Sequence, residues 1–175
     1  MKNNNVRKLV FAALCVALGI ILPVAFHSIP KAGSIFLPMH IPVLLCGLLC
    51  GPLYGGLCGA LAPLLSSFIT GMPPAAILPS MLCELLVYGL TAGLLARFIH
   101  TKWRLLDLYL QLIGAMLAGR IVAGILNALI FQAGQYSFDA FLAASFITAL
   151  PGIVIQLAVL PVLVLGLEKA RLVKV

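Results

Sequence analysis

The sequence contains very little charge. Only 4 of its 175 residues are acidic and 11 are basic, so charged residues make up 9% of the chain. A soluble globular domain has roughly 25% charged residues. The hydrophobic fraction of 63% and the mean hydropathy of +1.22 are too high for a chain that folds in water. We therefore expect an integral membrane protein that uses lipid as its solvent.

The sequence also lacks a linker. No Ser/Pro/Gln-rich stretch, long charged run or polar block divides the chain, so residues 1–175 are expected to form one membrane domain.

The first apolar run follows basic residues, as in a secretory signal. It is about 18 residues long, however, and no small-x-small cleavage site follows it. We expect this run to remain as a transmembrane helix.

Enzyme motifs are absent as well. The chain has no GxxxxGK[ST] phosphate-binding loop, no GxSxG and no HExxH. Its four acidic residues, Glu84, Asp107, Asp139 and Glu168, are far apart in the sequence. Although Cys46 and Cys50 are one helical turn apart, no histidine or further cysteine completes a tetrahedral set at ligand spacing. We expect no catalytic residue and no metal site.

Six apolar stretches separated by polar or Pro/Gly breaks predict a compact all-α bundle of six transmembrane helices. They cover residues 9–26, 41–50, 53–69, 75–98, 106–133 and 141–167. The second and third stretches are short and meet at Gly51-Pro52. A tight turn or one broken helix would both fit this dipeptide.

The distribution of basic residues predicts the orientation, because Lys and Arg are retained on the cytoplasmic side during insertion. With six spans and a cytoplasmic N-terminus, nine basic residues fall inside: Lys2, Arg7, Lys8, Arg97, Lys102, Arg104, Lys169, Arg171 and Lys174. Only Lys31 falls outside, and Arg120 lies within the fifth span. Both termini are therefore expected in the cytoplasm.

The net charge of +7 thus reflects topology and attraction to the lipid bilayer, and we expect no nucleic-acid partner.

Small residues recur at a helical spacing in the second and third spans. Gly47, Gly51, Gly55 and Gly59 follow one another at intervals of four. In lipid, small residues at this spacing let helix backbones approach closely and gain dispersion contacts. This pattern predicts dense packing between helices.

Four polar residues lie within the predicted spans: Glu84, Arg120, Asn127 and Gln156. Such residues are costly in a bilayer unless they face protein, water or a ligand. At a rise of ~1.5 Å per residue, Glu84 and Arg120 both lie roughly 13 to 20 Å below the outer surface. They could form a structural ion pair. Alternatively, Arg120 and Asn127 could donate to a ligand, and Glu84 could accept from it, beneath outer loops at 26–40 and 69–75.

Three segments carry a resemblance to a known family. FLPMHIPVLLCGLLCGPLYGG, PLLSSFITGMPP and MLCELLVYGLTAGLL resemble the substrate-binding S components of energy-coupling factor (ECF) transporters, and the chain length, six spans and basic connectors agree. Members capture a vitamin or related micronutrient outside a prokaryotic plasma membrane. They associate with a transmembrane coupling subunit and two cytoplasmic ATPase subunits. The resemblance implies that ATP and Mg²⁺ are used by those partners and that this chain holds no cofactor.

The resemblance also implies positions for the binding site and the docking surface. Ala13 and Ala17 match an Ala-xxx-Ala pattern that docks the coupling subunit. The candidate substrate-binding residues are Phe36, Met39, His40, Thr70, Met72, Glu84, Tyr88, Arg120, Asn127 and Gln156. Arg120 suits an anionic group and Glu84 a hydroxyl or amine, so a small carboxylate such as pantothenate is expected. Nicotinate, folate, riboflavin and pyridoxine stay open, as do the alternatives of an intramembrane enzyme and a structural or assembly subunit.

Overall fold

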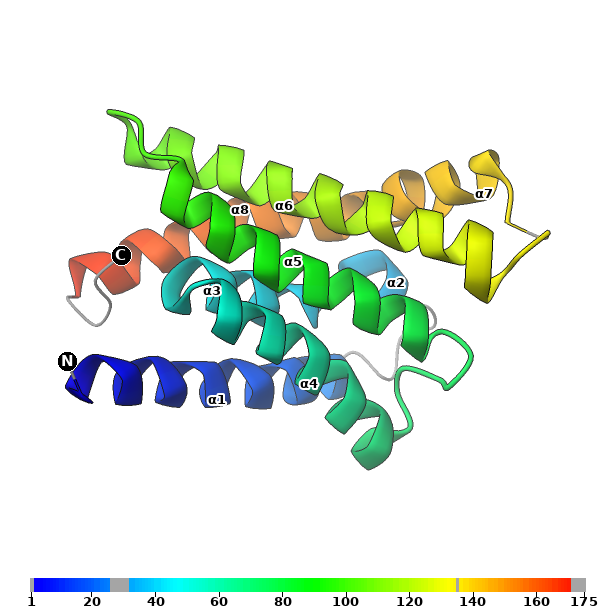
Figure 1. Ribbon diagram of the computed structural model, residues 1–175, viewed down its shortest axis with the longest axis horizontal. Helices are drawn as coiled ribbons and strands as arrows, with labels where there is room; N and C mark the ends of the chain where they lie inside the picture. Colours follow the sequence, from blue (N-terminus) through cyan, green and yellow to red (C-terminus); the bar gives the residue numbers. More distant parts are fainter. Residues whose placement is uncertain (1, 26–31, 135, 171–175) are drawn as a thin grey trace.

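The computed structural model describes residues 2–25, 32–134 and 136–170, and this part of the chain is helical without strands. Its α-helices are α1 (Lys2–Ala25), α2 (Ala32–Phe36), α3 (His40–Cys50), α4 (Pro52–Thr70), α5 (Leu78–Phe98), α6 (Arg104–Leu126), α7 (Phe138–Leu142) and α8 (Leu150–Lys169). Two π-helical segments, η1 (Asn127–Phe131) and η2 (Ala143–Thr148), follow α6 and α7. Figure 1 shows the long helices lying side by side along one axis.

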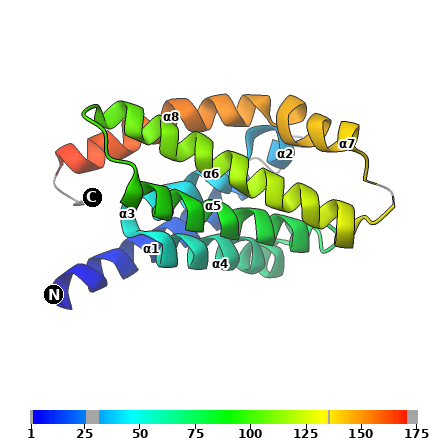
Figure 2. The same cartoon turned by 45° about the horizontal axis from the view of Figure 1, so that its top comes forward.

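The prediction of an all-α bundle with six spans is confirmed. Within the described residues, six helical stretches are long and apolar enough to cross a bilayer. The second is Gly33–Cys50, which combines α2 and α3, and the fifth is Arg104–Phe131, which combines α6 and η1. Helix α3 lies at the centre and is buried along almost all of its length, whereas α1 lies at the periphery and packs mainly against α3 and α4 (Figure 2).

The break between the second and third spans is a tight turn. Gly51 has φ +93°, a conformation that L-residues rarely adopt, and Pro52 occupies the first position of α4. The backbone nitrogen of Gly51 donates to the carbonyl of Gly47 and closes α3. Gly51 therefore turns the chain back so that α4 packs against α3, and it is the one glycine of the predicted series where an added Cβ atom would meet no atom within 4 Å.

Two predicted boundaries differ from the structure. The expected outer loop 26–40 contains α2, which ends before Leu37 at φ +50°, and residues 26–31 lie outside the described residues. The expected sixth span, 141–167, is broken near Ala149 into η2 and α8. Pro151 explains the break, because a proline at the start of a helix has no N–H to continue the preceding hydrogen-bond ladder.

Glycines place α3, α4 and α5 in backbone contact. A Cβ atom added at Gly55 would overlap the carbonyl of Gly89, and one added at Gly89 would overlap the carbonyl of Gly55. Added Cβ atoms at Gly59 and Gly93 would overlap the backbone at Leu85 and Pro52 in the same way. The dense packing predicted from the small-residue spacing is therefore present, and the backbone at Gly51 takes part in it through Gly93.

The described ends of the chain lie at the same end of the bundle, where α1 begins and α8 ends (Figure 1). The short connection between α5 and α6 lies at this end too and carries Arg97, Lys102 and Arg104. Arg104 forms an ion pair with Glu168, which ties the start of α6 to the end of α8. Because Lys and Arg gather at cytoplasmic ends, we expect this end to face the cytoplasm. Lys31, Arg171 and Lys174 lie outside the described residues.

Candidate functional site

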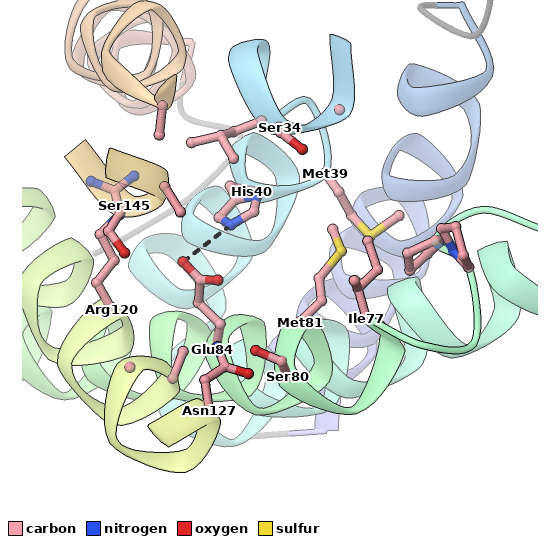
Figure 3. A pocket seen from close by; sticks show the side chains of 18 of the residues that line it. Ser34, Met39, His40, Ile77, Ser80, Met81, Glu84, Arg120, Asn127 and Ser145 are labelled. Atoms are coloured by element: carbon pink, nitrogen blue, oxygen red, sulfur yellow. Dashed lines mark ion pairs between the residues drawn. The ribbon is translucent and has the colours of Figure 1, made fainter. Parts of the chain in front are cut away.

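A cavity of about 380 Å³ lies at the end of the bundle opposite the termini. It is bounded by the segment 33–40, the loop 72–77, the outer halves of α5 and α6, and the segment 144–149. Ligand pockets commonly measure about 300 to 1,000 Å³, so the cavity suits a small molecule. Figure 3 shows its side chains converging from α3, α5, α6 and η2.

Side chains at the end of α4 form hydrogen bonds with the loop 72–77, which borders the cavity. Ser66 Oγ donates a hydrogen bond to the carbonyl of Met72 at 2.7 Å, and Ser67 Oγ donates to the carbonyl of Pro73 at 2.8 Å. Thr70 Oγ1 accepts from the backbone nitrogen of Met72 at 3.2 Å. These hydroxyl groups replace the backbone partners that the loop lacks after α4 ends, and they hold Met72 at the cavity rim.

Glu84 presents its carboxylate to the cavity. His40 Nε2 lies 3.7 Å from Glu84 Oε1, and the His40 side chain is only 2% exposed whereas that of Glu84 is 22% exposed. Tyr88 packs edge-on against His40, with ring centroids 5.1 Å apart. His40 is thus buried against Tyr88 and the Glu84 carboxylate of α5. The carboxylate remains reachable from the cavity (Figure 3).

Arg120 brings a buried positive charge to the cavity wall from the adjacent helix α6. It is 4% exposed, and its guanidinium carbon lies 5.6 Å from the centroid of the Phe146 ring. Within the described residues no carboxylate pairs with it, and its Nη2 atom has no hydrogen-bond partner. The ion pair between Glu84 and Arg120 that the sequence left open is not formed, because Glu84 turns to His40 and Arg120 to Phe146.

Asn127 lies two helical turns beyond Arg120, where α6 gives way to η1. Its side chain is buried and its Oδ1 atom has no hydrogen-bond partner. A buried amide without a partner costs about 1 to 3 kcal/mol. Arg120 and Asn127 both line the cavity, so their unused hydrogen-bonding capacity is directed at the same space.

The structure brings six of the ten candidate residues together around the cavity: Met39, His40, Met72, Glu84, Arg120 and Asn127. Thr70 contacts the loop and Tyr88 contacts His40, so each lies behind a lining residue. Phe36 lies beside Gly152 of α8. Gln156 is fully buried, with neither polar side-chain atom hydrogen-bonded, and lies outside the lining. The assignment of all ten as ligand contacts stays a prediction.

Sequence analysis missed several residues of this site. Ser80 and Met81 line the cavity one turn before Glu84, on the same face of α5, and helical periodicity could have identified them. Ser145 also lines the cavity and Phe146 contacts Arg120. These two carry no such signal, because they lie in a π-helical segment whose side chains do not follow the α-helical period.

The cysteines form no site of this kind. Cys15, Cys46, Cys50 and Cys58 are all buried in the bundle, and none lines the cavity. Across the part of the chain that the structure describes, no group of three or more His, Cys, Asp or Glu side chains is placed to hold a metal ion.

The fold and the cavity define a class: a multi-pass membrane protein with a small-molecule cavity at one end of a six-helix bundle. Residues 7–164 match the model of the family described as ECF transporter, substrate-specific component. The chain belongs to this family, and the resemblance seen in the sequence is confirmed. Comparison with curated proteins and with solved structures gives no match. The family is a transporter component and not an enzyme, so the chain is a membrane-embedded substrate-binding subunit.

Proposed function

We propose that the cavity binds a small water-soluble micronutrient that carries a carboxylate, of the pantothenate type, for ATP-driven uptake. The observation that supports this proposal is Arg120, which is buried at the cavity wall and forms no salt bridge with any of the described residues. A buried cation without a partner is strongly unfavourable. A ligand carboxylate would supply the missing charge and match the planar fork of the guanidinium.

Glu84 favours a ligand that also carries hydrogen-bond donors, at an end other than its carboxylate. Glu84 accepts hydrogen bonds but cannot donate them when ionised, and its carboxylate is open to the cavity. Hydroxyl, amide or ammonium groups would satisfy it. The remaining lining is largely apolar, with Met39, Met72, Met81 and Ile77, so it suits a short hydrocarbon between the two polar ends.

The proposed route into the cell requires partners. Ala13 and Ala17 lie on the exposed face of α1, whereas Ala12, Cys15 and Gly19 face the bundle. An exposed pair of small residues at a spacing of four allows close approach of another helix. This face is proposed to dock the transmembrane coupling subunit in a prokaryotic plasma membrane. Two cytoplasmic ATPase subunits would then use ATP and Mg²⁺, and this chain would hold no cofactor.

The test compares two ligands that differ at one group. Pantothenol carries a hydroxyl where pantothenate carries a carboxylate, so only pantothenate can neutralise Arg120. We expect the purified wild-type protein to bind pantothenate at least about 30-fold more tightly in calorimetry, since a buried charged hydrogen bond is worth at least ~2 kcal/mol. Native mass spectrometry should also detect a carboxylate-bearing ligand retained through purification. Equal affinity for the two compounds, or a retained ligand without an acid group, would contradict the proposal.

A further inference from the structure

The Arg120 guanidinium contacts an aromatic ring from a distant part of the chain. Its central carbon lies over the Phe146 ring, 5.6 Å from the ring centroid. This geometry is a cation–π contact, which is worth more when the cation is desolvated, as Arg120 is. A cation–π contact uses none of the hydrogen-bonding capacity of the Nη2 group, which has no hydrogen-bond partner among the described residues.

Neighbouring aromatic residues fix the position of Phe146. Phe141 packs edge-on against it, with ring centroids 5.9 Å apart and an angle of 85° between the planes. Phe141 in turn lies over Gly124 of α6, where an added Cβ atom would come within 2.6 Å of the Phe141 ring. Because Gly124 is one turn after Arg120, the same face of α6 supports both the arginine and the aromatic pair.

Residues of the π-helical segment η2 contribute both to the cavity lining and to the contact with Arg120. Ala144 and Ser145 line the cavity, and the next residue, Phe146, contacts Arg120. Figure 3 shows Ser145 beside the end of the Arg120 side chain. A π-helical turn is wider than an α-helical one and is frequently found at functional sites. Here it places an aromatic ring against the guanidinium and the preceding residue, Ser145, in the cavity lining.

We propose that Phe146 is a positioning residue: it holds the Arg120 guanidinium in the orientation that makes the cavity selective for a carboxylate. This inference rests on the proposed function, in which Arg120 binds the acid group of the ligand. An arginine side chain has many rotamers, and ordering it on binding costs affinity. A ring that orders it beforehand removes that cost for a carboxylate and has no comparable effect on a neutral ligand.

The first experiment measures affinity for pantothenate and pantothenol in Phe146→Leu, Phe146→Tyr and Phe138→Leu. Phe146→Leu keeps an apolar side chain but removes the ring, so pantothenate affinity should fall about three- to thirty-fold while pantothenol affinity stays unchanged. Phe146→Tyr keeps the ring and should restore wild-type preference. Phe138 is the control, because it lies in the neighbouring helix α7, is 72% exposed and has its ring contact with Phe141, whereas the ring at Arg120 is that of Phe146.

The second experiment needs no ligand. NMR of protein labelled with ¹⁵N-arginine reports the Nε–H resonance of Arg120, which is assigned by its loss in Arg120→Lys. The Phe146 ring should displace this resonance, so Phe146→Leu should move it and Phe138→Leu should not. A resonance that does not move in Phe146→Leu overturns the inference.

The two proposals fail in different ways. A wild-type protein without preference for pantothenate overturns the proposed function. A wild-type protein with that preference, combined with a folded Phe146→Leu variant that retains it, overturns only the role of Phe146. A parallel loss of affinity for both ligands in Phe146→Leu also overturns it, because that result indicates a damaged cavity and not a misplaced guanidinium. Thermal unfolding of each variant confirms that it is folded.

Discussion

The two charged residues of the cavity have separate partners although they lie on adjacent helices. Glu84 faces His40 and Arg120 faces Phe146. A direct ion pair between them would have satisfied each charge with the other and left neither available to a ligand. Because the pair is not made, the cavity has one wall that attracts an anion and another that accepts hydrogen bonds. This separation of charge is what a ligand with two different polar ends requires.

Replacing Arg120 should therefore affect binding more than folding. We expect Arg120→Ala to weaken pantothenate affinity by at least ~2 kcal/mol, because it removes the only cation of the lining among the described residues. Arg120→Lys should not restore it, since an ammonium lacks the planar fork. Calorimetry measured together with thermal unfolding checks both variants, and wild-type affinity in a folded Arg120→Ala protein would show that the site is assigned wrongly.

A double-mutant comparison provides the control for this prediction. Without an ion pair, the losses of stability in Arg120→Ala and Glu84→Ala should add to within about 0.5 kcal/mol in the double variant. A structural ion pair would instead let the double variant recover stability that the single variants lose.

At the scale of elements, the contact between α4 and α5 depends on the absence of side chains. Gly55 and Gly89 lie backbone to backbone, and neither has room for a Cβ atom. In lipid the hydrophobic effect does not drive helices together, so close contact between backbones provides much of the attraction. This contact fixes α5, and with it the depth of Glu84 below the loop 72–77.

We expect Gly89→Ala to lower the free energy of unfolding by roughly 1 to 3 kcal/mol, because the added methyl group overpacks the interface. Gly166→Ala is the matched control, since Gly166 is also helical but has no neighbouring atom within 4 Å of an added Cβ. That variant should be neutral or slightly more stable, because alanine favours helices. Unfolding measured in detergent tests both, and equal stability of the two variants would argue against the contact.

The elements were predictable where their signal is local. Apolar length gave the six spans, and Gly51-Pro52 gave the turn between α3 and α4, although not the choice between a turn and a broken helix. The helix α2 and the π-helical segments were not predictable. Their sequences are as apolar as the spans beside them, and their geometry follows from packing around the cavity and not from hydropathy.

At the scale of the whole molecule, α1 has the smallest buried share of the six membrane spans. It packs on α3 and α4, and most of its residues are exposed. Its inward residues contact the bundle, as Gly19 does beside Ala62, while Ala13 and Ala17 face outward. A helix that is attached on one side presents the other to lipid or to a partner helix, and small outward residues favour the partner.

Ala13→Leu combined with Ala17→Leu should abolish uptake of radiolabelled pantothenate in cells that hold the complete transporter, and should leave binding by the purified chain unchanged. The added volume blocks close approach of the coupling subunit but does not reach the cavity. Ala158→Leu is the control, because Ala158 is an exposed alanine in the middle of α8. Normal uptake in the double variant would remove this face of α1 from the interface.

The sequence by itself determined the number of spans and the end of the bundle that faces the cytoplasm. Both follow from sums over neighbouring residues: hydropathy along one helix, and Lys and Arg counted in short connections. Only the tertiary structure decided which polar residues meet. Glu84 and Arg120 share a depth but point to His40 and Phe146, and Gln156 is buried outside the lining. These outcomes depend on the rotation of each helix about its axis, which is set by packing between residues far apart in the chain.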